Sequence, residues 1–145
     1  MGATADPRPR ILYVEDDPTF LETVPRVLEQ AGFEVITATR TDEAHELISR
    51  HGNPDFALLD LGLGVDDRGG ELLATAIRER DGLIPIMMLS ADATDLSNER
   101  CRKAGAWDFV VKDSDDGRGQ RLVAKINSLL EIAQRIRQRN VQEPL

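Results

Sequence analysis

Short, mainly apolar segments alternate along the chain with longer amphipathic ones. The apolar segments cover residues 11–14, 34–39, 56–59, 86–89 and 109–111. The first, third and fourth are apolar at every position, which is typical of parallel strands buried on both faces of a sheet. The pattern therefore predicts five strands.

The segments between these strands carry helix signals. Asp17 and Pro18 open the first, because Pro is favoured at the first helical position, and Gly32 closes it. Thr41 is expected to cap the second. Pro25 lies inside the first helix, where it costs about 3 kcal/mol, and predicts a kink. Further helices are expected over about 70–80, 94–104 and 119–139.

Strands that alternate with helices in this way predict one fold class. The connections are expected to be right-handed βαβ crossovers. The fold is then α/β, with a doubly wound parallel sheet of five strands.

Side chains that can take part in binding or catalysis follow four of the five predicted strands. Glu15 and Asp16 follow the first strand, Asp60 the third, Ser90 the fourth and Lys112 the fifth. Ligands of open parallel sheets bind outside the carboxyl ends of the strands. We therefore expect these side chains to form one site.

The residue types at this edge indicate a metal-assisted phosphoryl site. Carboxylates gathered closely repel one another unless a cation lies among them. Oxygen ligands without Cys or His favour Mg²⁺ or Mn²⁺. The metal, the Lys112 ammonium and the Ser90 hydroxyl can each take one oxygen of a phosphoryl group, with Asp60 as the candidate nucleophile.

Four motifs resemble those of response-regulator receiver domains, in the CheY-like superfamily of two-component signalling. They occupy residues 11–17, 58–61, 88–91 and 109–112. The resemblance implies a flavodoxin-like (βα)5 fold in three layers, with strand order 2-1-3-4-5. It implies a receiver domain over 10–131, a disordered N-terminal arm over 1–9, and an extension of the last helix with a tail over 132–145.

The resemblance also implies a phosphoacceptor and a metal site. Asp60 would accept a phosphoryl group from a sensor histidine kinase or a phosphotransfer protein. Glu15, Asp16, Asp60 and the main-chain carbonyl of Gly62 would hold Mg²⁺ (or Mn²⁺). The chain would then not be an enzyme in the usual sense, because it would catalyse only its own phosphorylation and dephosphorylation.

A conformational switch is the second implication of the resemblance. Lys112 would bind the phosphoryl group, Ser90 would be the switch hydroxyl and Phe109 the switch aromatic. Phosphorylation would change the surface formed by the fourth helix, the fifth strand and the fifth helix. This surface would contact an output partner or a second copy of the chain.

Three positions depart from the pattern of that family. Asp113 stands where a Pro usually follows the lysine, which makes a cis peptide bond there unexpected. Gly64 replaces a common Pro, and the glycines between 62 and 70 make the loop after Asp60 permissive. Asp92 adds an acidic side chain near Ser90 and is expected to alter the lifetime of the phosphoryl group.

Alternative interpretations remain open at this stage. Asp16 or Asp17 can act as helix caps alone. A Mg²⁺-dependent phosphatase with an aspartyl nucleophile would share the acids, although Gly62 occupies the position of its second acid. A dinucleotide-binding fold lacks its Gly-rich turn here. A receiver-like module that binds partners without phosphorylation is a further alternative.

The last helix has an apolar seam of coiled-coil spacing. The seam consists of Leu122, Ile126, Leu129, Ala133 and Ile136. Its first part is expected to pack on the sheet. Ala133 and Ile136 are expected to need a separate partner, either a second copy of the chain or a downstream domain for which the helix is a linker.

Composition narrows the class and location of the protein. The 145 residues suit one domain. A net charge of −8 argues against direct binding of nucleic acid, and no apolar run reaches the ~18 residues of a membrane helix. The single cysteine, Cys101, is expected to be a helix-surface thiol in a reducing compartment. We therefore expect a cytoplasmic protein that acts alone or within a longer signalling chain.

Overall fold

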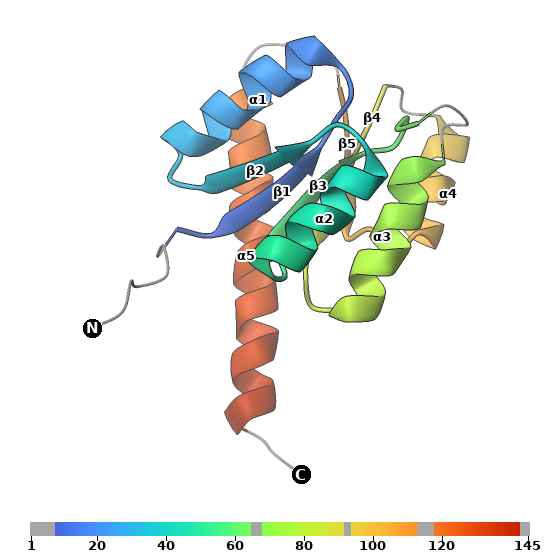
Figure 1. The fold of residues 1–145 in the computed structure, drawn as a ribbon. Coiled ribbons are helices and arrows are strands. Elements are labelled where there is room, and N and C mark those ends of the chain that lie inside the picture. Colours follow the sequence, from blue (N-terminus) through green and yellow to red (C-terminus); the bar gives the residue numbers. More distant parts are fainter. Residues whose placement is uncertain (1–7, 65–67, 92–93, 113–117, 143–145) are drawn as a thin grey trace.

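The computed structural model describes residues 8–64, 68–91, 94–112 and 118–142, and within them five strands alternate with five helices (Figure 1). The strands are β1 (Arg10–Val14), β2 (Glu34–Ala38), β3 (Phe56–Asp60), β4 (Ile86–Ser90) and β5 (Asp108–Val111). The helices are α1 (Pro18–Gln30), α2 (Thr41–His51), α3 (Gly69–Arg80), α4 (Asp95–Lys103) and α5 (Arg118–Gln142). Within these ranges no helix has the length and apolar content that crossing a membrane requires.

The strands form one parallel sheet in the order β2-β1-β3-β4-β5. This confirms the predicted α/β flavodoxin-like fold and its strand order. Helices α1 and α5 cover one face of the sheet, and α2, α3 and α4 cover the other (Figure 1). In a parallel sheet all five carboxyl ends lie at the same edge, where residues far apart in the sequence meet.

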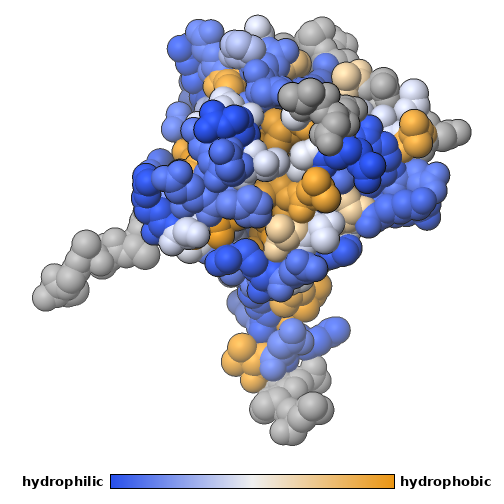
Figure 2. Space-filling view, turned by 45° about the vertical axis from the view of Figure 1, so that its right-hand side comes forward, coloured by the Kyte–Doolittle hydropathy of each residue, from blue (hydrophilic) through white to orange (hydrophobic). Residues whose placement is uncertain are grey.

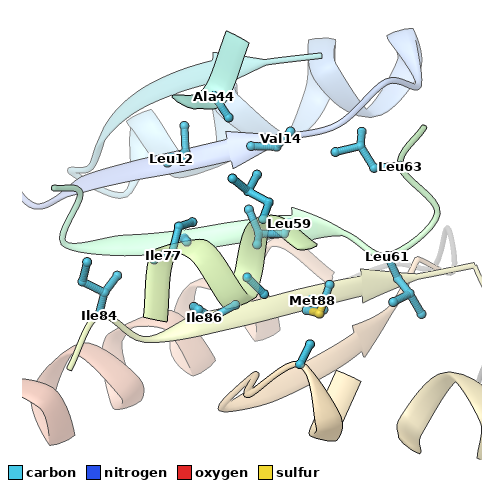
Figure 3. Packing of buried hydrophobic residues seen from close by; sticks show 14 of the residues in the cluster. Leu12, Val14, Ala44, Leu59, Leu61, Leu63, Ile77, Ile84, Ile86 and Met88 are labelled. Atoms are coloured by element: carbon cyan, nitrogen blue, oxygen red, sulfur yellow. The ribbon is translucent and has the colours of Figure 1, made fainter. Parts of the chain in front are cut away.

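Two apolar clusters form the core, one on each face of the sheet. Leu12 and Val14 of β1 point into the cluster beneath α2 and α3, as Figure 3 shows. Ile11 and Tyr13, the alternate positions of the same strand, belong to the cluster beneath α1 and α5. Each fully buried large aliphatic side chain contributes roughly 1.5–3 kcal/mol, so β1 is held from both sides.

Of the predicted N-terminal caps of α1 and α2, the structure has the first but not the second. The Asp17 side chain accepts a hydrogen bond from the Thr19 N–H at 2.8 Å, which confirms it as the cap of α1. The prediction that Thr41 caps α2 was wrong, because Thr41 is already helical and the cap position has no side-chain hydrogen bond. Glu43 instead reaches back and accepts from the Thr39 N–H at 2.6 Å. Helix α1 continues through Pro25 to Gln30.

Part of the C-terminal half of α5 contacts the rest of the domain. Ala133 is buried, and Arg137 donates to the Asp81 carboxylate at 2.8 Å, in the turn between α3 and β4. The expectation that Ala133 needs a separate partner was therefore wrong. Ile132 and Val141 remain exposed on this helix, and Figure 2 shows apolar side chains where it projects below the domain.

Cys101 is buried in α4, contrary to the expected surface thiol. It packs in the cluster that contains Ile86 and Met88. Burial raises the pKa of its thiol to about 11, although the neighbouring Arg100 opposes this change. A thiol in that state is a core side chain with little thiolate character.

Candidate functional site

Three carboxylates converge at the carboxyl edge of the sheet. Glu15 and Asp16 follow β1, and Asp60 ends the neighbouring strand β3. One oxygen from each lies within 4.8 Å of the other two. Glu15 and Asp60 are buried, whereas Asp16 is exposed. The sheet thus brings together acids from sequence positions that are far apart.

Lys112 supplies the positive charge of this cluster. Its Nζ lies 2.8 Å from Glu15 Oε2 and 3.2 Å from Asp60 Oδ1. The ammonium also lies 4.9 Å from the centroid of the Phe20 ring, within the range of a cation–π contact. The Lys112 N–H donates to the Ser90 carbonyl at 2.6 Å, which extends the pairing of β4 and β5 to the site.

Glu15 is held by donors from three directions. Its Oε1 accepts a hydrogen bond from the Tyr13 hydroxyl at 3.2 Å. Its Oε2 accepts from the Asp17 N–H at 3.2 Å and from Lys112. Tyr13 and Glu15 are two residues apart, so a strand presents both side chains on one face.

Tight backbone packing fixes the position of Asp60. Its Oδ1 accepts a hydrogen bond from the Gly62 N–H at 2.9 Å, and the Leu61 N–H donates to the Leu89 carbonyl at 2.7 Å. A Cβ on Gly70 would lie 2.2 Å from the Asp60 carbonyl oxygen. Gly70 is therefore required by this close approach between α3 and β3, which is a more specific reason than the loop flexibility predicted for it.

The charges at the site are unbalanced. Burial raises the pKa of Glu15 to about 7; the bond to Lys112 opposes this rise, and Asp60 adds to it. Burial lowers the pKa of Lys112, but the bond to Glu15 and the charges of both acids outweigh it, so that the pKa lies above its usual value. Burial and the Glu15 carboxylate raise the pKa of Tyr13 far above its usual value, so its hydroxyl stays a donor.

The donor set fits a hard divalent cation. It consists of carboxylate oxygens alone, and the described part of the chain adds neither Cys nor His to the group. Mg²⁺ prefers one or two carboxylates, together with waters and phosphate oxygens. A cation among these acids would favour the ionised Glu15 carboxylate, whose pKa is raised by burial and further by Asp60.

The remaining predicted site residues lie on β4, on β5 and in the loop after β3. Ser90 is buried at the carboxyl end of β4, beside the strand that carries Asp60. Phe109 is half-buried in β5. It packs against the apolar core cluster on the face of the sheet that α3 and α4 cover. Gly62 directs its N–H toward Asp60, and the metal-binding role of its carbonyl stays a prediction. Asp92 and Asp113 lie outside the described residues.

A second ion pair ties the start of α3 to α4. The Arg100 guanidinium donates to Glu71 Oε1 at 2.6 Å, and both side chains are largely buried. Glu71 follows Gly70 directly, so the pair joins the helix beside Asp60 to α4.

Sequence reasoning missed the roles of Tyr13, Phe20 and Gly70 around the site. A tyrosine in an otherwise aliphatic strand, two residues before Glu15, was the signal for the first. Phe20 and Gly70 had no such signal, because their contacts depend on how α1 and α3 pack against the sheet.

Comparisons with known proteins show the family and the fold of the chain. Residues 11–127 match the model of the response regulator receiver domain family. The transcriptional regulatory protein PrrA of Mycobacterium tuberculosis is 37% identical over 84% of this chain and 50% of its own length. The chain spans about half the length of the first curated relatives it matches and about a quarter of two others.

Solved structures show the same likeness. The BeF3-activated N-terminal receiver domain of Klebsiella pneumoniae RstA is 28% identical, with a TM-score of 0.72 over 83% of this chain and 97% of that chain. A CheY-like receiver domain protein of Methanospirillum hungatei is 25% identical, with a TM-score of 0.76 over 88% of this chain and 98% of that one.

Proposed function

The chain belongs to the response regulator receiver domain family of two-component systems, and from this premise we propose that Asp60 is its phosphoacceptor. The donor would be a sensor histidine kinase or a phosphotransfer protein. The observation that carries the proposal is the buried Asp60 carboxylate, which Lys112 contacts at 3.2 Å beside two further acids.

The chemistry of the proposed transfer is a substitution at phosphorus. An Asp60 oxygen attacks the phosphorus of a phosphohistidine, and an O–P bond forms as the N–P bond breaks. The electron pair of the broken bond goes to the imidazole nitrogen, which takes up a proton. Lys112 and the Ser90 hydroxyl stabilise the negative charge on the phosphoryl oxygens. In the later hydrolysis, a water oxygen would attack the phosphorus, the O–P bond to Asp60 would break, and inorganic phosphate and the free carboxylate would be released. The domain would then catalyse only its own phosphorylation and dephosphorylation.

Glu15, Asp16 and Asp60 would hold the divalent cation, together with the main-chain carbonyl of Gly62. The chemistry of the three carboxylates supports Mg²⁺, or Mn²⁺ in its place. When bound, the cation supplies positive charge that compensates the acids and the incoming phosphoryl oxygens.

We further propose that phosphorylation acts on the surface formed by α4, β5 and α5. Ser90 and Phe109 would be the switch residues, because one ends β4 and the other packs from β5 toward the α3 and α4 side. The receiver would occupy 10–131, with 1–9 as an arm and 132–145 as an extension. Its output would be a partner, a homodimer, or a downstream domain, since the chain covers only about half the length of the first relatives.

The test is the intact mass of the protein after incubation with acetyl phosphate, with and without Mg²⁺. We expect a gain of one phosphoryl group that requires Mg²⁺ and disappears in Asp60→Asn. The matched control is Asp55→Asn, because Asp55 lies just before β3, at the opposite end of the strand. It should be phosphorylated like the wild type.

Two other outcomes would contradict the proposal. A folded protein that binds Mn²⁺ but gains no phosphoryl group would be a receiver-like module that acts by contact alone. Steady release of phosphate from added phosphomonoesters would favour the alternative of an aspartyl phosphatase.

A further inference from the structure

The chain has a single tyrosine, and its hydroxyl lies inside the protein. The Tyr13 ring fills the cluster beneath α1 and α5, where a phenylalanine ring would serve equally well as an apolar filler. A buried hydroxyl is costly unless it forms a hydrogen bond. Here its bond goes to Glu15 Oε1 at 3.2 Å. The hydroxyl therefore has a task beyond packing.

The donors to Glu15 are divided between its two oxygens. Lys112 and the Asp17 N–H both bind Oε2, and Tyr13 binds Oε1. The last torsion of a glutamate side chain has a broad, two-fold preference and sets the plane of the carboxylate weakly by itself. Donors on both oxygens fix that plane. Loss of the tyrosine hydroxyl would leave only the Oε2 side fixed by these bonds.

We propose that Tyr13 is a positioning residue for the divalent-cation site, acting through Glu15. Its hydroxyl would hold the glutamate plane in the orientation that faces Asp16 and Asp60. The inference rests on the proposed function, since it takes the three acids as the cation site. Groups that hydrogen-bond to metal ligands typically change metal affinity by about 10- to 100-fold.

The test is direct titration with Mn²⁺, in which the electron paramagnetic resonance signal of the free ion is measured. This test needs no phosphoryl donor. We expect Tyr13→Phe to raise the Mn²⁺ Kd about tenfold. The matched control is Thr75→Val, which also removes one hydroxyl, one that donates to the Glu71 carbonyl within α3. Its Kd should equal that of the wild type.

A second measurement needs no variant. With one tyrosine, protein labelled at the tyrosine Cζ carbon gives one carbon signal, which responds to the hydrogen bond of the hydroxyl. We expect Mg²⁺ to shift this signal, and Ca²⁺-free, Mg²⁺-free buffer to restore it. Thermal unfolding, monitored by circular dichroism, checks that the Tyr13→Phe variant is folded.

The outcomes separate the inference from the proposed function. Equal Mn²⁺ affinity in Tyr13→Phe and the wild type, or a carbon signal that Mg²⁺ does not move, overturns the role of Tyr13 and leaves the cation site intact. A lower melting temperature with unchanged affinity would show a packing role and would also overturn it. No Mn²⁺ binding by the wild type would overturn the cation site of the proposed function itself.

Discussion

The two edges of the sheet carry the same kinds of charged side chain in different surroundings. At the carboxyl edge, Lys112 lies between Glu15 and Asp60, whose side chains are 0% and 5% exposed. At the amino edge, Arg10 pairs with Glu34 and Arg137 with Asp81. The side chains of these two pairs are between 26% and 48% exposed.

The balance of charge differs as well as the burial. Each amino-edge pair joins one cation to one acid in contact with water, an arrangement worth about 0–1 kcal/mol. At the carboxyl edge three acids lie together, and one lysine contacts two of them. Buried charges cost free energy unless they are compensated. The amino edge is therefore electrostatically satisfied, whereas the carboxyl edge has room for a further positive charge.

Replacing the central lysine tests this contrast most strongly. Lys112→Met leaves two buried carboxylates without their cation, and we expect it to lower the free energy of unfolding by about 3 kcal/mol in metal-free buffer at pH 8. Phosphorylation by acetyl phosphate should slow about 100-fold, because one charged donor to the phosphoryl oxygens is lost. Urea unfolding and intact mass measure the two effects.

The control is the same substitution at a lysine whose ion pair with an aspartate is exposed. Lys125 lies 3.0 Å from Asp108, with side chains 47% and 34% exposed. Lys125→Met should cost less than about 1 kcal/mol and leave phosphorylation unchanged. Equal losses in the two variants would remove the distinction between the edges.

The pH dependence of stability gives the next largest effect. The pKa of Glu15 is raised from 4.5 to about 7. At a pH between these two values, the folded protein therefore holds a proton on Glu15 that the unfolded chain has released. The stabilisation from the protonated form is complete below pH 4.5 and is lost as the pH rises toward 7. In metal-free buffer the wild type should therefore lose stability relative to Glu15→Gln between pH 5 and 8, by on the order of 2 kcal/mol.

Urea unfolding at several pH values measures this difference. Glu34→Gln, at the amino edge, is the control and should keep the slope of the wild type because Glu15 is still present. Addition of Mg²⁺ should flatten the slope, because a bound cation favours the ionised carboxylate. A wild-type slope unchanged in Glu15→Gln would contradict the assignment.

Sequence patterns predicted the parts of the molecule that follow from topology. Parallel strands bring Glu15, Asp60 and Lys112 to one edge whatever the details of helix packing. Continuous apolar runs predicted β1, β3 and β4 well, because both faces of these strands are buried. The acids that form the cluster were predicted from the residue types alone, and the cation that they would hold stays a proposal.

Features that depend on side-chain reach and helix rotation were not predictable in this way. Cys101 is buried because α4 turns that position toward β4, although charged residues flank it. Ala133 is buried, and one turn further along α5 Arg137 pairs with Asp81 in the turn before β4, a contact that the periodicity of the sequence does not report. Thr41 does not cap α2 because the helix already includes it and Arg40 stands at the cap position, while the long Glu43 side chain binds the Thr39 N–H. In each case a contact distant in space or a long side chain decided the outcome.

The smallest expected effect comes from the amino edge itself. Arg137→Met breaks the pair with Asp81, whose side chains are 48% and 28% exposed, and should cost only about 0.5 kcal/mol in urea unfolding. Because this pair fastens α5 to the turn before β4, amide hydrogen exchange should still rise in the last two turns of the helix. Arg135→Met is the control, since among the described residues Arg135 pairs with Glu131 of its own helix. A loss above about 2 kcal/mol in Arg137→Met would mean that an exposed pair can match a buried one here, and burial would no longer explain the difference between the two edges.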